Sequence, residues 1–398
     1  MRLTLALFLF ALIIGSSPSF AQDASFKTWL SELRVEASQK GISKKTLDAA
    51  LTGLKPIPRV LELDRRQPEF TWTFRDYMSK LINDQRVKKG QRKLAENKKV
   101  LDEIGAKYGI QPRFLVAFWG LETDFGRLSE GYFPTIAALA TLAHDGRRSK
   151  FFRIQLMAAL KILDQGHISP AKLKGSWAGA MGHFQFIPTT FLAYAQDYDG
   201  DGKKNIWGNK LDAYASAANF LTKSGWKDDE IWGREVTLPK GFDFNQASLK
   251  VKKTLAGWQA LGVRRLDGSH LPNVDIKASV VTPAGAEGPA FLVYGNFRTI
   301  MVWNRSIFYA IAVGHLADRL LGAPKLSKLG PKNDTGLSFD EGRILQQRLS
   351  ALGFDTGGVD GVVGPKSREA IRAFQRKAGL VPDGYPSPSL LKHVRKGL

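Results

Sequence analysis

The sequence predicts a mainly α-helical fold with a small β-containing insertion and a separate C-terminal three-helix unit. Three observations predict it. Apolar residues recur at spacings of three and four through most of residues 22–223. Short β-rich runs separated by Pro and Gly occupy 231–298. Two further helical stripes follow a linker-like stretch near the C-terminus. At 398 residues, 43% of them hydrophobic, the chain is long enough for two or three domains with real cores.

The first 21 residues have the pattern of an export signal. Arg2 precedes an unbroken apolar run from Leu3 to Ile14, and small residues surround position 21. The run is shorter than the roughly 20 residues that span a bilayer. We therefore predict a signal peptide over 1–21, cleaved near Ala21, no transmembrane segment in the mature chain, and a periplasmic protein. An uncleaved anchor is the alternative.

The sequence contains no cysteine, so disulfides, a thiolate nucleophile, cysteine zinc sites and lipidation of an N-terminal Cys are all excluded. Lys and Arg number 58 against 37 Asp and Glu, a formal net charge of +21. This charge favours a polyanionic partner. An export signal without a nucleic-acid motif argues against nucleic acid, the usual partner, and in favour of cell-wall polymers. The alternative is a solvated basic surface that aids solubility.

The predicted elements follow in order along the chain. An apolar helix begins after Pro112, covers 114–125 and ends at Gly126. Further helices are predicted at 134–144, 149–164, 188–196, 211–223 and 306–321, and strands at 235–238, 277–281 and 290–294. Linker composition over 322–337 separates the unit at 338–398.

Glu122 lies on the apolar side of the helix over 114–125. At 100° per residue it falls between Leu115 and Phe118, so we predict that it points inward, whereas Asp124 lies about 160° away. A carboxyl held against aromatic rings is poorly solvated, which raises its pKa. It is then a proton donor near neutral pH, as an acid catalyst of glycosidic cleavage must be. The alternative is a buried glutamate satisfied by backbone groups or an arginine.

Five sequence blocks carry a resemblance to a known family. Glycines flank the carboxyl in 120–126, and three more fall within eight residues of 175–188, where they permit close approach of a ligand. With 133–152, 199–207 and 296–310, these blocks resemble the membrane-bound lytic murein transglycosylase B family, over about residues 26–321. The resemblance implies a lysozyme-like helical catalytic domain over 22–321, with 231–298 as a β-containing insertion, and places Glu122 where the family has its single catalytic acid.

The family resemblance also implies a reaction and a set of substrate-binding residues. In the family, one glutamic acid protonates the oxygen between N-acetylmuramic acid and N-acetylglucosamine and then deprotonates the C6 hydroxyl that closes a 1,6-anhydro ring, with no cofactor required. By motif position, substrate would be bound by Ser176, Gln185, Trp303, Asn304 and Tyr309. Their alternatives are a helix cap for Ser176, a packed amide for Gln185 and a core position for Tyr309.

Residues 197–202 match the first half of a calcium loop. Asp197, Asp199 and Asp201 occupy positions 1, 3 and 5, and Gly202 occupies the turn position. The second half fails, because Gly208 stands where a bidentate Glu is expected. Some members of the resembled family bind calcium in such a loop, and Asp212 with the Lys203 carbonyl would complete a structural site. The alternative is an Asp-Gly turn.

The C-terminal unit resembles the peptidoglycan-binding domain common in wall hydrolases. Leu345, Leu349 and Leu352 form one helical stripe, and Ala370, Ile371 and Phe374 form another. The resulting prediction is a lytic transglycosylase that cleaves the β-1,4 bond of peptidoglycan glycan strands, held to the wall by this module. The alternatives are a noncatalytic peptidoglycan-binding scaffold and a hydrolytic lysozyme-type muramidase.

Overall fold

The computed structural model describes residues 18–65 and 72–397. Most of the predicted signal peptide, residues 1–17, lies outside this part of the chain, so its cleavage stays a prediction. The first helix, α1 (Pro18–Gln39), runs through the expected cleavage position. Within the described residues no helix has the length and apolar character to cross a membrane.

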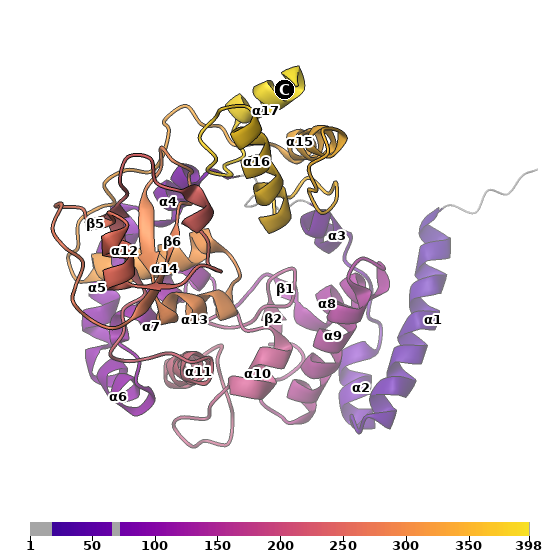
Figure 1. Ribbon diagram of the computed structural model, residues 1–398. Coiled ribbons are helices and arrows are strands. Elements are labelled where there is room, and N and C mark those ends of the chain that lie inside the picture. The colour runs from indigo at the N-terminus through magenta and orange to yellow at the C-terminus, as the bar shows by residue number, and fades with distance from the viewer. Residues whose placement is uncertain (1–17, 66–71, 398) are drawn as a thin grey trace, which may run out of the picture.

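Helices build the described residues of 18–223 and 295–320, as the apolar spacing predicts (Figure 1). The N-terminal helices are α1, α2 (Lys44–Leu51), α3 (Pro58–Arg65), α4 (Phe74–Leu81), α5 (Asp84–Glu96) and α6 (Lys98–Tyr108). The central helices are α7 (Pro112–Thr123), α8 (Thr135–His144), α9 (Ser149–Asp164), α10 (Pro188–Tyr194) and α11 (Lys210–Lys223). The pair α13 (Gly295–Trp303) and α14 (Ile307–Leu320) completes this portion. The predicted helices at 134–144, 149–164, 188–196, 211–223 and 306–321 are confirmed to within two residues at each end.

Helix α7 is the centre of the main core. Six consecutive residues from Phe114 to Trp119 are at most 1% exposed, so this helix is apolar on all sides and enclosed by others. Helices α5, α6, α11 and α14 pack around it. Because α7 is enclosed in this way, the side chains of its last turn are held at fixed positions.

The insertion is a five-stranded antiparallel sheet in the order β4-β6-β7-β3-β5. Its longer strands, β3 (Gly233–Thr237), β6 (Lys277–Val281) and β7 (Ala290–Val293), match the predicted runs. Four short elements were not predicted: the two-residue strands β4 (Lys253–Thr254) and β5 (Arg264–Arg265), the helix α12 (Leu255–Ala260) and the 3-10 helix η2 (Phe244–Gln246). A separate pair, β1 (Phe133–Pro134) and β2 (Lys174–Gly175), joins the central helices.

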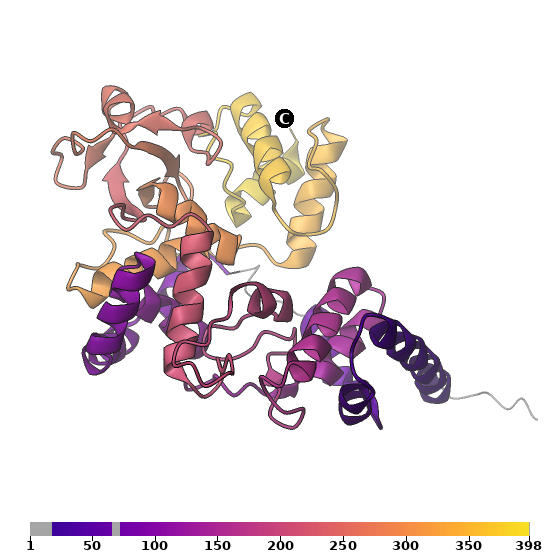
Figure 2. The same ribbon diagram turned by 90° about the horizontal axis from the view of Figure 1, so that it is seen from below.

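The C-terminal unit has the three predicted helices, α15 (Phe339–Ala351), α16 (Pro365–Lys377) and α17 (Pro388–Lys396), around their own core. It rests on the β insertion (Figure 2). Asp383 accepts a hydrogen bond from the Ala286 backbone at 2.9 Å, and Lys250 pairs with Glu369 at 3.4 Å. The predicted linker is itself anchored, because Arg75 donates to the carbonyl of Pro331 at 3.1 Å.

Candidate active site

Helix α7 presents Glu122 from its last turn. Pro112 opens the helix with its fixed φ, as expected. The helix ends two residues earlier than predicted, because Asp124 and Phe125 adopt left-handed conformations, with φ of 51° and 58°, before Gly126 at 86°. Two successive non-glycine residues in this region cost of order 1–2 kcal/mol each. Backbone strain of this kind clusters at functional sites, and here it follows Glu122 directly.

The Glu122 carboxyl accepts two hydrogen bonds at one oxygen. The indole Nε1 of Trp303 donates to Oε1 at 3.0 Å, and the hydroxyl of Tyr309 donates to the same atom. Burial raises the pKa of Glu122 to about 7, although both donors lower it by stabilising the charged form. The side chain nevertheless keeps a partly exposed surface. A carboxyl that is largely desolvated, still reachable and half-protonated near neutral pH is suited to give a proton and take one back.

Trp303 ends α13 inside a group of aromatic rings. The rings of Phe118, Phe186 and Phe220 have centroids 4.6, 5.4 and 4.8 Å from that of Trp303, and Phe184 lies at 6.2 Å. By motif position, Trp303 is predicted to bind substrate. In the structure its N–H points toward Glu122 and its ring packs among phenylalanines.

Tyr309 and Asn304 differ in their relation to Glu122. Tyr309 lies in the first turn of α14 and is only 6% exposed, with its hydroxyl on the carboxyl. Burial, followed by the nearby Glu122 charge, raises the pKa of Tyr309 well above its ordinary value, so it remains a donor. Asn304 is exposed at the end of α13, where its Oδ1 accepts from the Ser306 backbone at 3.2 Å.

The glycine-rich loop at 175–187 is fixed to α7 through His183. Trp119 Nε1 donates to His183 Nδ1 at 3.0 Å, and the Thr123 hydroxyl donates to the His183 carbonyl at 2.8 Å. The Ser176 hydroxyl accepts from the Ala180 backbone at 3.1 Å, and Gln185, at a φ of 50°, donates to the Gly182 carbonyl at 3.0 Å. Both predicted loop residues are therefore held by local hydrogen bonds beside the helix that carries Glu122.

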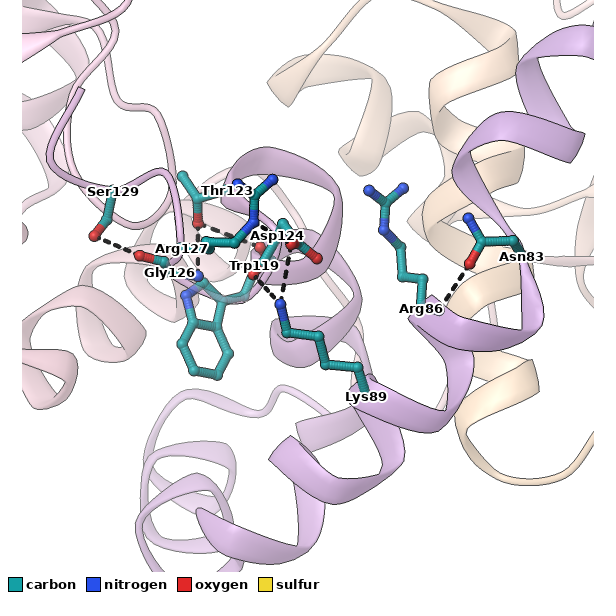
Figure 3. Close-up of polar contacts among 9 residues, drawn as sticks. All are labelled: Asn83, Arg86, Lys89, Trp119, Thr123, Asp124, Gly126, Arg127 and Ser129. Carbon is teal, nitrogen blue, oxygen red and sulfur yellow. Dashed lines mark hydrogen bonds and ion pairs between the residues drawn. The ribbon is translucent and has the colours of Figure 1, made fainter. Parts of the chain in front are cut away.

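A charged network secures the other side of the same turn (Figure 3). Lys89 on α5 donates to the carbonyl of Asp124 at 3.1 Å and to its carboxylate at 3.0 Å, and Arg127 pairs with that carboxylate at 2.7 Å. These two cations offset the desolvation of Asp124 and leave its pKa below the usual value. The Asp124 carboxylate is thus committed to Lys89 and Arg127 rather than to Glu122. Sequence reasoning missed Lys89, which is distant in the chain and belongs to no recognisable motif. It also gave no role to His183, although this residue lies in the glycine-rich block at 175–188.

The predicted calcium loop brings three of its acidic residues together. Ligand oxygens of Asp197, Asp199 and Asp201 lie within 4.8 Å of one another. Asp212 is fully buried and acts differently: its two oxygens accept the backbone N–H groups of Tyr198 at 2.8 Å and Asn205 at 2.7 Å. It closes the loop at its base. Lys203 follows the cluster, with its backbone N–H on Asp201 at 2.8 Å.

A family model for the transglycosylase SLT domain matches residues 25–318. The chain belongs to this family of lytic transglycosylases. A second model, for a peptidoglycan binding domain, matches residues 340–394. The chain is 31% identical to membrane-bound lytic murein transglycosylase B of Escherichia coli K12, over 70% of this chain and 78% of that protein. These matches agree with the two resemblances found in the sequence.

Solved structures of lytic transglycosylases share the fold. SltB3 of Pseudomonas aeruginosa in complex with NAG-anhNAM-pentapeptide superposes with a TM-score of 0.90 at 45% identity, covering 93% of this chain and 99% of that one. The Escherichia coli lytic transglycosylase Slt35 in complex with calcium has a TM-score of 0.63 at 28% identity, covering 76% and 94%. The predicted mainly α, lysozyme-like fold with a C-terminal peptidoglycan-binding domain is confirmed.

Proposed function

We propose that this chain is a lytic transglycosylase of peptidoglycan in which Glu122 is both the acid and the base. Protonated Glu122 gives its proton to the oxygen that leaves C1 of N-acetylmuramic acid. The resulting carboxylate takes the proton of the sugar's own C6 hydroxyl, whose oxygen bonds to C1 and forms the 1,6-anhydro ring. One observation carries the proposal: the pKa of Glu122 is raised to about 7 by burial while two neutral donors support its charged form.

A single carboxyl suffices because the nucleophile belongs to the substrate. An internal hydroxyl has a high effective concentration, so no water needs to be activated by a second residue. Hydrolytic glycosidases of the two usual types need a second carboxylate about 5–9 Å from the first. Among the described residues no charged side chain contributes to the pKa of Glu122, and Asp124 is committed to Lys89 and Arg127. This favours the lytic reaction over a lysozyme-type muramidase.

Roles for the neighbouring residues follow from their contacts. We assign Tyr309 and Trp303 to positioning the carboxyl and stabilising its charge. Ser176 and Gln185, held in the loop beside α7, would offer polar groups to the sugars, and exposed Asn304 would do so from the end of α13. The C-terminal domain would keep the enzyme on glycan strands. The pattern of residues 1–21 supports export to the periplasm.

The test compares wild type with Glu122→Gln on purified sacculi. Gln has the same shape and accepts both hydrogen bonds but cannot donate and recover a carboxyl proton. We expect wild type to release anhydro-muropeptides, detected by mass spectrometry, and the variant to release almost none. Products with reducing ends only would indicate a muramidase. Equal release by both proteins would rule out catalysis through Glu122 and would favour a noncatalytic peptidoglycan-binding scaffold.

Calcium binding at Asp197, Asp199 and Asp201 is a second proposal, structural and separate from the chemistry. The oxygen donors are of the type that calcium prefers, and three carboxylates this close repel one another without a cation. The Lys203 carbonyl would add a neutral ligand. Both Asp212 oxygens already accept hydrogen bonds from backbone N–H groups. Asp212 would therefore hold the loop in shape for the ion rather than coordinate it.

A further inference from the structure

We propose that a basic pocket beside the catalytic loop binds the free carboxylates of the peptides attached to the glycan strand. The pocket has a volume of about 870 Å³, within the size range of small-ligand sites. It lies between the start of α2, the connection from α9 to β2, and the end of the acidic loop. Glu122, Trp303 and Tyr309 do not line it, so it is a different site from the catalytic centre. This inference rests on the proposed function.

The charge of the pocket is strongly one-sided. Lys45, Lys172, Lys174 and Lys203 line it, against a single acidic lining residue, Glu130. All four lysines are exposed, and none of them is among the ion pairs found in the described part of the chain. Four unpaired cations around one concavity repel each other, and an anion bound there would relieve this repulsion.

The remaining lining groups add shape rather than charge. Burial lowers the pKa of His167 and the Lys204 charge lowers it further, while the nearby Asp197 carboxylate acts in the opposite direction, and the net effect disfavours the charged imidazole. Its Nδ1 accepts the Lys204 backbone N–H at 3.2 Å, which joins this wall to the acidic loop. Trp207 supplies an apolar surface on the same side. A ligand with several carboxylates and short aliphatic parts matches a pocket of this kind.

The pocket adjoins the catalytic loop through shared backbone. Lys174 lies in β2, and Ser176 follows it by two residues. Gly131, next to the lining residue Glu130, packs so closely on Gly175 that a Cβ there would lie 2.5 Å from its backbone. The same short segments thus form a wall of the pocket and lead into the loop proposed to hold the sugars. In peptidoglycan the peptide hangs from the muramic acid, so a strand held by this loop has carboxylates to present to the pocket.

The test uses a triple variant, Lys172→Gln, Lys174→Gln and Lys203→Gln, with a control that removes the same charge from the exposed lysines Lys223, Lys240 and Lys252. The substrates are peptide-bearing glycan strands and the same strands with peptides removed. We expect the triple variant to lose about tenfold in kcat/KM through KM on the peptide-bearing strands only, the sum of three modest ion contacts. The control should match wild type on both.

A binding measurement identifies the ligand chemistry. Calorimetry with a soluble muramyl peptide should show binding to wild type and to Glu122→Gln, and weaker binding once the carboxylates are amidated. An equal loss of activity on both substrates, equal binding of the amidated peptide, or equal competition by inorganic phosphate would overturn the proposal. Failure of the proposed function is distinguishable, because wild type would then give no anhydro products from either substrate.

Discussion

The indole nitrogen of Trp303 lies 3.0 Å from Oε1 of Glu122, 181 residues away in the chain. With the Tyr309 hydroxyl it forms a pair of neutral donors on a desolvated carboxyl. Burial favours the protonated acid and the donors favour the carboxylate, so the balance places the pKa at about 7, where both forms are available. An acid that later serves as a base needs both.

Removing one donor should move the pH profile toward alkaline pH. In Tyr309→Phe the ring remains and only the hydroxyl is lost, so the pKa of Glu122 rises. A hydrogen bond to a charged group contributes about 1.5–3 kcal/mol, which corresponds to a shift of about one unit or more. The alkaline limb of kcat/KM, where the acid loses its proton, should shift upward by that amount. Tyr108→Phe, which loses a hydroxyl on α6, is the control, and an unchanged limb in Tyr309→Phe would contradict the assignment.

Glu122→Gln should stabilise the protein at alkaline pH. The ordinary pKa of 4.5 rises to about 7 in the fold, so the unfolded chain loses its proton first as the pH increases. The wild type therefore loses stability between pH 4.5 and 7, by about 3 kcal/mol at most, and carries the full penalty above pH 7. Gln carries none. The gain in melting temperature over wild type should be present at pH 8 and vanish near pH 4.5, whereas a gap that is equal at both values would show that Glu122 is not desolvated. Exposed Glu130→Gln is the control.

The contact between Lys89 and Asp124 should be needed for both stability and rate. Lys89→Met keeps the aliphatic stem but leaves the Asp124 carbonyl and carboxylate without that donor at the strained turn after Glu122 (Figure 3). We expect a loss of about 1 kcal/mol in the free energy of unfolding, measured with urea, and a lower kcat at unchanged KM. Lys88→Met removes an exposed neighbour on the same helix. If the two variants behave alike, the network does not position the acid.

Sequence reasoning located Glu122 because helical periodicity is a local property. The direction of its side chain follows from Leu115 and Phe118, a few residues away. Trp303 and Tyr309 were found only through family resemblance, since no spacing relates them to Glu122. Lys89 and His183 were missed for the same reason: their contacts with α7 span 35 and 64 residues.

The errors in the fold also have physical causes. The end of α7 was placed at Gly126 because glycine is the usual left-handed residue, but Asp124 already adopts that conformation, held by Lys89 and Arg127. Strands β4 and β5 are only two residues long and exist through pairing with β6 and β3. So short a segment has no detectable alternation of apolar residues.

In the acidic loop, the proposed calcium ligands and the residue that holds the loop backbone should respond differently to mutation. If Asp197, Asp199 and Asp201 bind calcium, millimolar calcium should raise the melting temperature and a chelator should reverse the effect. Saturation a hundredfold above the dissociation constant stabilises by about 2.7 kcal/mol, a shift of several degrees. Asp199→Asn should abolish the response with little change in the calcium-free melting temperature, because Asp199 is exposed. Asp212→Asn should lower the melting temperature with or without calcium, because the buried carboxylate holds the Tyr198 and Asn205 backbone amides. An unchanged calcium response in Asp199→Asn would place the ion elsewhere.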